Sequence, residues 1–120
     1  MGHSIGHFAR KREEYRRLLE ESVKKAVSAI CDLQGVVRIS LVGSLARGRA
    51  DLCSDIDLVV VMCTQMPFIE RLRLIYGSLC LPVDVDVLCY TPEEFEELRE
   101  KPFLKNLLRG EVVLYEKNSC

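Results

Sequence analysis

The sequence has no tryptophan, no C-x-x-C pair and almost no net charge. Single-stranded nucleic acid is commonly bound by aromatic side chains that stack on the bases, and the lack of tryptophan gives such binding little support. Seventeen basic residues nearly cancel eighteen acidic ones, so the net charge of −1 provides no overall field for nucleic acid or an anionic membrane. We therefore expect no nucleic-acid partner.

Long apolar runs are also missing. The longest, Leu58–Cys63, is far shorter than the roughly 20 residues of a membrane-spanning helix, so we expect no membrane partner. The N-terminus has no apolar signal segment, which favours a cytoplasmic location with the six cysteines reduced, although a disulfide stays open. His3 and His7 are the only histidines, so a zinc site is disfavoured.

A length of 120 residues allows a single domain, which we place at 10–120 after a flexible tail at 1–9. Apolar residues at helical spacing, β-rich runs and turn residues alternate along this domain. The expected helices cover 10–33, a short turn that opens at 43, 67–79, a segment that starts at 91, and 102–109; the expected strands cover 36–42, 56–63, 83–89 and 112–115. This order predicts an α/β (α+β) fold, in which helices flank a small mixed sheet.

Two Asp-x-Asp pairs interrupt apolar strands. Asp55 and Asp57 begin the second expected strand, and Asp84 and Asp86 lie on the third. The period of two residues in a strand places each pair on one face. One pair could simply face solvent, but two such pairs favour a metal site, because gathered carboxylates suit Mg²⁺ or Mn²⁺.

A glycine turn follows the first expected strand. Gly43 allows close approach of a phosphate, Ser44 can donate from its hydroxyl, and Arg47 and Arg49 add charged donors. The glycine spacing matches the first half of a P-loop. However, Arg49 and Ala50 stand where a P-loop needs Lys and Ser or Thr, so this alternative is disfavoured.

Together these residues resemble a known family. Gly43-Ser44, ten intervening residues, Asp55-x-Asp57 and then a strand aspartate form a pattern typical of the DNA polymerase β-like nucleotidyltransferase superfamily. The fuller stretches around these motifs look like its minimal nucleotidyltransferase (MNT) branch. The stretches that carry this resemblance are 41–48, 54–58, 82–95 and 110–115.

The resemblance implies a nucleotidyltransferase fold and a two-metal site. Asp55 and Asp57 would hold two Mg²⁺ ions, or Mn²⁺, and the aspartate on the third strand would bind the second ion and help deprotonate the attacking hydroxyl. The distance in sequence to the Thr-Pro-Glu-Glu stretch at 91–94 favours Asp86 for this role, with Asp84 as the alternative.

The resemblance also implies the substrate. Gly43 and Ser44 would hold the phosphates of ATP, and Arg47 would neutralise their charge. The reaction would be attack of a hydroxyl on the α-phosphate, with release of pyrophosphate and transfer of AMP.

Members of the MNT branch commonly act with a helical HEPN protein as a toxin–antitoxin pair. The implied role is an antitoxin that transfers AMP to a tyrosine of its HEPN toxin. Two alternatives stay open: an antitoxin that neutralises its partner by binding alone, and a transferase for a small molecule, whose pocket would need another chain such as a second copy in a homo-oligomer.

Overall fold

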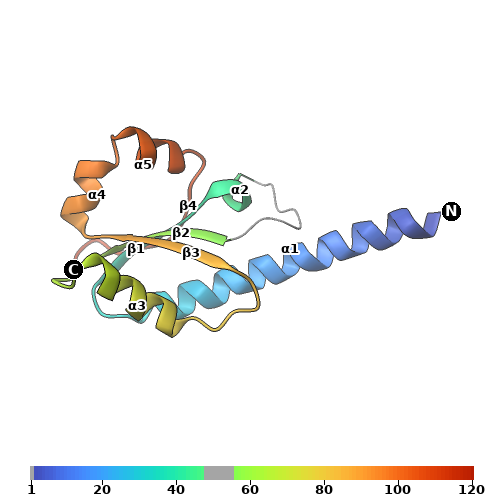
Figure 1. Ribbon diagram of the computed structural model, residues 1–120, viewed down its shortest axis with the longest axis horizontal. Coiled ribbons are helices and arrows are strands. Elements are labelled where there is room, and N and C mark those ends of the chain that lie inside the picture. Colours follow the sequence, from blue (N-terminus) through green and yellow to red (C-terminus); the bar gives the residue numbers. More distant parts are fainter. Residues whose placement is uncertain (1, 48–55) are drawn as a thin grey trace.

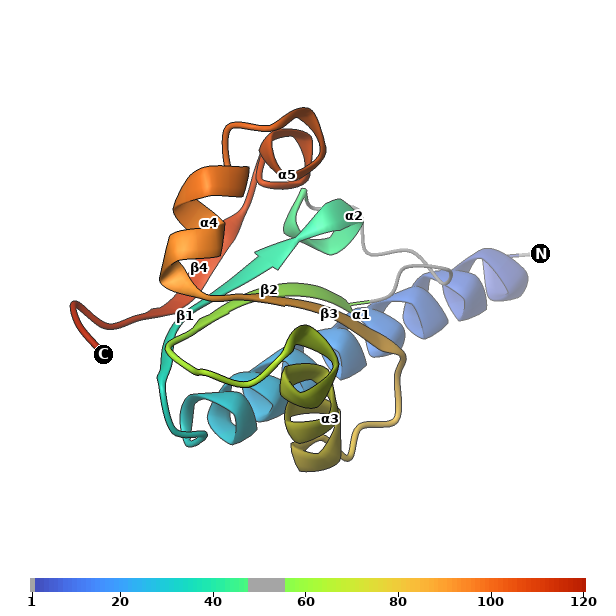
Figure 2. The ribbon, with the colours of Figure 1, turned by 60° about the vertical axis from the view of Figure 1, so that its left-hand side comes forward.

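The computed structural model describes residues 2–47 and 56–120 (Figures 1 and 2). Within these ranges helices and strands follow the order expected from the sequence. In chain order they are α1 (Gly2–Cys31), β1 (Val36–Val42), α2 (Gly43–Ala46), β2 (Ile56–Met62), α3 (Phe68–Ser78), β3 (Val85–Tyr90), α4 (Pro92–Leu98), α5 (Pro102–Leu107) and β4 (Val112–Glu116).

The strands form one sheet in the order β3-β2-β1-β4. β1 is antiparallel to both β2 and β4, whereas β2 and β3 are parallel. A parallel pair needs a connection that crosses back over the sheet, and α3 provides it. The expected small mixed sheet flanked by helices is therefore confirmed.

Helices cover both faces of this sheet. Figure 2 shows α1 and α3 on one side and α4 with α5 on the other. The central strand β2 contributes to the core on both sides, because alternate residues of a strand point to opposite faces. This explains why every residue of Leu58–Met62 is apolar and at most 3% exposed. Asp57 directly precedes this run, near the N-terminal end of β2.

The first helix is longer than expected. α1 begins at Gly2, so it includes most of the segment 1–9 that the sequence predicts to be a flexible tail. Its fully buried residues start at Leu19, and its N-terminal part projects beyond the sheet (Figure 1). The spacing of apolar residues shows where a helix packs against the core, and not where the helix begins. A helix that is already formed can extend beyond its packed part, because each added residue gains one hydrogen bond.

The start of α4 is the capping box that the sequence predicts. The Thr91 hydroxyl accepts from the Glu94 amide at 3.2 Å, and the Glu94 carboxylate accepts from the Thr91 amide at 2.9 Å. The same carboxylate accepts two bonds from Arg71 of α3, whose side chain is only 7% exposed. Glu94 therefore joins the two helices that flank β3.

The expectation that the cysteines are reduced is wrong for one pair. Cys63, directly after β2, is joined to Cys120 by a disulfide. The two residues are 57 positions apart, so no local pattern indicates the bond. They meet because β4 runs antiparallel to β1, which carries the residues after β4 back toward the end of β2.

None of the described helices is long and apolar enough to cross a membrane.

Candidate active site

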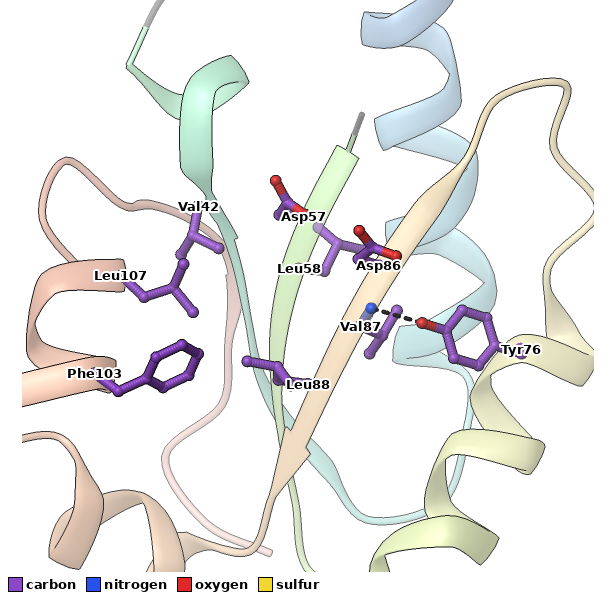
Figure 3. Close-up of a pocket in the computed structure, with 9 residues that line it drawn as sticks. All are labelled: Val42, Asp57, Leu58, Tyr76, Asp86, Val87, Leu88, Phe103 and Leu107. Carbon is purple, nitrogen blue, oxygen red and sulfur yellow. Dashed lines mark hydrogen bonds between the residues drawn. The ribbon is translucent and has the colours of Figure 1, made fainter. Parts of the chain in front are cut away.

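Two of the expected carboxylates lie side by side. Asp57 of β2 and Asp86 of β3 are register partners in the parallel pair, so their backbones are separated by the strand spacing of about 4.8 Å. Figure 3 shows both carboxylates at one end of a hollow. Asp57 is half-buried and Asp86 is exposed. Carboxylates gathered at one end of a hollow repel each other, and a cation between them would relieve that repulsion.

The glycine turn lies directly against this pair. Gly43 adopts φ +79°, and a Cβ at this position would lie 2.5 Å from Oδ2 of Asp57. Only glycine combines this left-handed conformation with such a close approach. Gly43 also begins α2, in which Ser44 follows at once. The predicted turn residues and the Asp57 carboxylate are thus brought together.

Arg47, which we expect to neutralise the phosphates, bonds to backbone carbonyls in the structure. It follows α2, is exposed, and donates from Nη2 to the carbonyl of Asn106 at 3.3 Å and from Nε to the carbonyl of Arg109 at 3.4 Å. These carbonyls belong to the C-terminal end of α5 and the turn after it. Arg47 therefore ties the glycine turn to α5.

The structure separates the two candidates on the third strand. Asp84 precedes β3, and its carbonyl accepts from the Ile56 amide at 3.2 Å. Its side chain lines another hollow, together with Tyr15 of α1. Asp86 lines the same hollow as Asp57. Of the two, the geometry joins Asp86 to Asp57.

Two candidates from the sequence lie outside the described residues. Asp55 directly precedes Ile56, the first residue of β2, and Arg49 lies in the same segment, 48–55. The described part of the site therefore consists of Asp57, Asp86 and the turn at Gly43.

The hollow beside the carboxylates has a volume of about 370 Å³. Its other walls are mostly apolar and come from the sheet, α3 and α5 (Figure 3). The lining residues are Val42, Asp57, Leu58, Tyr76, Asp86, Val87, Leu88, Phe103 and Leu107. An apolar cavity with a few convergent polar groups is the usual form of a small-molecule site.

Sequence reasoning missed the part of this hollow that lies away from the carboxylates. The Tyr76 hydroxyl accepts from the Val87 amide at 2.8 Å, at the edge strand that borders the hollow. Phe103 of α5 is 67% exposed. A single Phe after Pro102 does not reveal from sequence whether it faces the core or a cavity.

An ionic network fixes the segment that follows α5. Arg38 of β1 donates to Glu111 at 3.0 Å and to the Ser40 hydroxyl at 2.8 Å. Burial alone would lower the pKa of Arg38, but its bond to Glu111 and the attraction of that carboxylate outweigh burial and raise it. Burial alone would raise the pKa of Glu111, but the hydrogen bond from Arg38 outweighs burial, so the pKa of Glu111 is lowered. Both groups therefore stay charged and hold the start of β4 against the sheet.

The carboxylates suit a hard divalent cation. Oxygen ligands from aspartate are those that Mg²⁺ prefers, and it is usually bound by one or two carboxylates with the remaining ligands from water and substrate phosphates. Among residues 2–47 and 56–120, no group of three His, Cys, Asp or Glu side chains is placed to hold a metal. Asp57 and Asp86 fit a magnesium ion that shares its coordination with a substrate.

Comparison with known proteins gives a family-model match over part of the chain. Residues 23–77 match the family model of the nucleotidyltransferase domain. The match runs from α1 through Gly43 and Asp57 to α3, and it ends before Asp86. No curated protein matches the sequence.

A solved structure is similar over most of the chain. The crystal structure of "a putative nucleotidyltransferase from Sulfolobus solfataricus" aligns with 91% of this chain and 86% of that one, with a TM-score of 0.56 and 18% sequence identity. At 18% identity this likeness shows only that the two chains share a fold. The match of residues 23–77 to the domain model supports a transferase of nucleoside monophosphates.

Proposed function

We propose that this chain is a Mg²⁺-dependent nucleotidyltransferase that transfers AMP from ATP to a hydroxyl group. The observation that carries the proposal is the register pairing of Asp57 with Asp86, beside a glycine turn against which the Asp57 carboxylate packs. The match of residues 23–77 to the nucleotidyltransferase domain supports the same reaction class.

Each residue has a role in the proposed reaction. Asp57 and Asp86, with Asp55, would hold the metal, and Gly43 and Ser44 would receive the β- and γ-phosphates. Two Mg²⁺ ions in such a site supply charge stabilisation at the attacking and leaving oxygens of an in-line displacement. Asp86 is exposed and therefore accessible to the acceptor, whose hydroxyl proton it would accept.

The bond changes balance as follows. The acceptor oxygen forms a bond to the α-phosphorus, and the bond between that phosphorus and the bridging oxygen of pyrophosphate breaks. The acceptor proton passes to a carboxylate and then to solvent. Arg47 could approach the phosphates only by leaving the carbonyls of Asn106 and Arg109, so we assign it to the rim of the site.

We further propose that the acceptor is a tyrosine of a helical HEPN partner, and that the transfer neutralises this partner as a toxin. The support is the resemblance of the sequence to the MNT branch. A small-molecule acceptor and neutralisation by binding alone are the outcomes that the experiment must separate from this role.

The test is transfer of label from α-³²P-ATP to a purified HEPN protein in the presence of Mg²⁺. Wild-type protein should label the partner, and Asp57→Asn should abolish the label. Asp32→Asn is the matched control, because Asp32 is exposed after α1 and lies outside the hollow. Neutralisation by binding alone predicts that Asp57→Asn still protects cells from the toxin. Lack of both labelling and Mg²⁺-dependent ATP binding by the wild type would contradict the proposed enzyme.

A further inference from the structure

The most exposed large apolar side chain of the described residues faces the candidate active site. Phe103 is 67% exposed, whereas its neighbour Leu104 is 2% exposed and packs in the core between α5 and the sheet. Leu104 thus fixes α5 on the sheet while Phe103 projects into the hollow (Figure 3). A single exposed apolar ring is ordinary on a protein surface. The position of Phe103 is informative because its ring borders the same hollow as Asp57 and Asp86.

The hollow has the form of a slot for a flat group. Figure 3 shows the Phe103 ring and the Leu88 side chain on opposite sides of it, with Leu107 and Val42 toward the carboxylate end. These walls are apolar and come from β1, β3 and α5. The carboxylate of Asp57 lies in the same hollow, so a single ligand could contact both ends.

We propose that Phe103 is the stacking platform for the nucleobase of the bound nucleotide. This inference rests on the proposed function, because Gly43, Ser44 and the metal held by Asp57 and Asp86 would then fix the triphosphate at one end of the hollow. The base of the same nucleotide is a planar, weakly polar group, and it must lie near the triphosphate to which it is joined through the ribose. The apolar slot bordered by Phe103 and Leu88 suits its faces.

The platform is held in place by the contacts described above. Arg47 bonds to the carbonyls of Asn106 and Arg109 at the end of α5, and Arg38 holds Glu111 just beyond it. Phe103 is therefore presented by a helix that is anchored on both the glycine turn and β1. A platform fixed before binding loses less conformational entropy when the ligand arrives.

Stacking also determines the expected specificity. Every base has a π-face, so an aromatic platform tolerates base identity. The lining of the hollow beyond the carboxylates offers mainly apolar side chains, which cannot read hydrogen-bonding edges. We therefore expect ATP and GTP to bind with similar affinity, and both to bind more tightly than CTP or UTP because purines present a larger face.

The experiment measures Mg²⁺-dependent binding of ATP and of inorganic tripolyphosphate by calorimetry, without any acceptor. Phe103→Leu should weaken ATP binding about 5- to 100-fold, the usual range for loss of one base–aromatic stack, and leave tripolyphosphate binding unchanged. Phe103→Trp should retain ATP binding. Phe68→Leu is the matched control, because Phe68 is 40% exposed on α3 and does not line the hollow.

Each alternative result has a distinct meaning. Equal ATP affinity in wild type and Phe103→Leu would overturn the platform and leave the proposed function standing. A weakening of ATP and tripolyphosphate alike would also overturn it, because Phe103 would then act on the structure of the site. Failure of wild-type protein to bind either ligand would overturn the proposed function and the platform together.

Discussion

Gly43 and Asp57 lie against each other at one end of two neighbouring strands: a Cβ on Gly43 would lie 2.5 Å from the carboxylate oxygen Oδ2 of Asp57. The two residues belong to adjacent strand ends, since Val42 at the end of β1 pairs with Asp57 at the start of β2. The turn and the carboxylate therefore share one space. A side chain at Gly43 must displace either the carboxylate or the ligand that it would bind.

The first prediction follows from this contact. Gly43→Ala should reduce nucleotide transfer by at least about 100-fold, because even small displacements of catalytic groups are costly. It should also destabilise the protein by about 1–2 kcal/mol, since alanine disfavours φ +79°. Labelling assays and urea denaturation measure the two effects separately.

Gly77 provides the matched control for Gly43. It lies in α3, and a Cβ there would meet nothing within 4 Å. Gly77→Ala should leave transfer unchanged and stabilise the protein by about 0.5–1 kcal/mol, because alanine is the better helix former. If Gly43→Ala kept wild-type activity, the close contact with Asp57 would have no functional meaning.

The second prediction separates the two aspartates of the third strand. Asp86→Asn should lower transfer by on the order of 100-fold, because Asp86 is the register partner of Asp57 and lines the same hollow. Asp84→Asn should change transfer by less than about twofold, because a surface substitution away from the site is usually neutral. The measurement is the initial rate of labelling at saturating ATP; equal losses in both variants would place Asp84 in the site as well.

The fold was accessible from the sequence because its signals are local. The run Val36–Val42 and the capping box at Thr91 predict elements that the structure contains. The pairing of Asp57 with Asp86 was not accessible in this way, because register depends on which strands become neighbours. The period of two restricts each aspartate to a face but leaves the register open between Asp84 and Asp86.

The missed residues have a similar physical explanation. Phe103 and Leu104 are adjacent apolar residues on a short helix, yet one is exposed in the hollow and the other is buried. Their different roles depend on how α5 docks on the sheet, and Arg47 contributes to that docking through distant carbonyls. Neither contact leaves a pattern in the local sequence.

The third prediction concerns the ion pair between α3 and α4. The hydrogen bond from Arg71, with that from the Thr91 amide, lowers the pKa of Glu94 below its ordinary value of 4.5. A carboxylate whose pKa falls on folding stabilises the native state above its unfolded pKa, and this contribution is lost as the pH falls through the folded value. Its contribution should therefore be complete near neutral pH and disappear in a window below 4.5.

Glu94→Gln tests this dependence. The variant leaves the largely buried Arg71 guanidinium without its charged partner and should cost about 2 kcal/mol near neutral pH. The difference from wild type in urea denaturation should shrink as the pH falls below 4.5. Glu93→Gln, one residue earlier and exposed in the same helix turn, should show no such loss. A pH-independent difference would mean that Glu94 acts through the cap geometry and not through its charge.

The fourth prediction concerns the disulfide. The bond between Cys63 and Cys120 closes a long loop of chain and should stabilise the protein by roughly 2–4 kcal/mol under oxidising conditions. Dithiothreitol should remove this stabilisation from wild type and have no effect on Cys120→Ser. Cys31→Ser, which removes a free thiol of α1, should respond to dithiothreitol as wild type does.

Cys63 follows the last residue of β2, whereas Asp57 lies near the first residue of that strand. Reduction should therefore lower the unfolding midpoint and leave the rate of nucleotide transfer unchanged; a parallel loss of activity would show that the tether also positions the carboxylates.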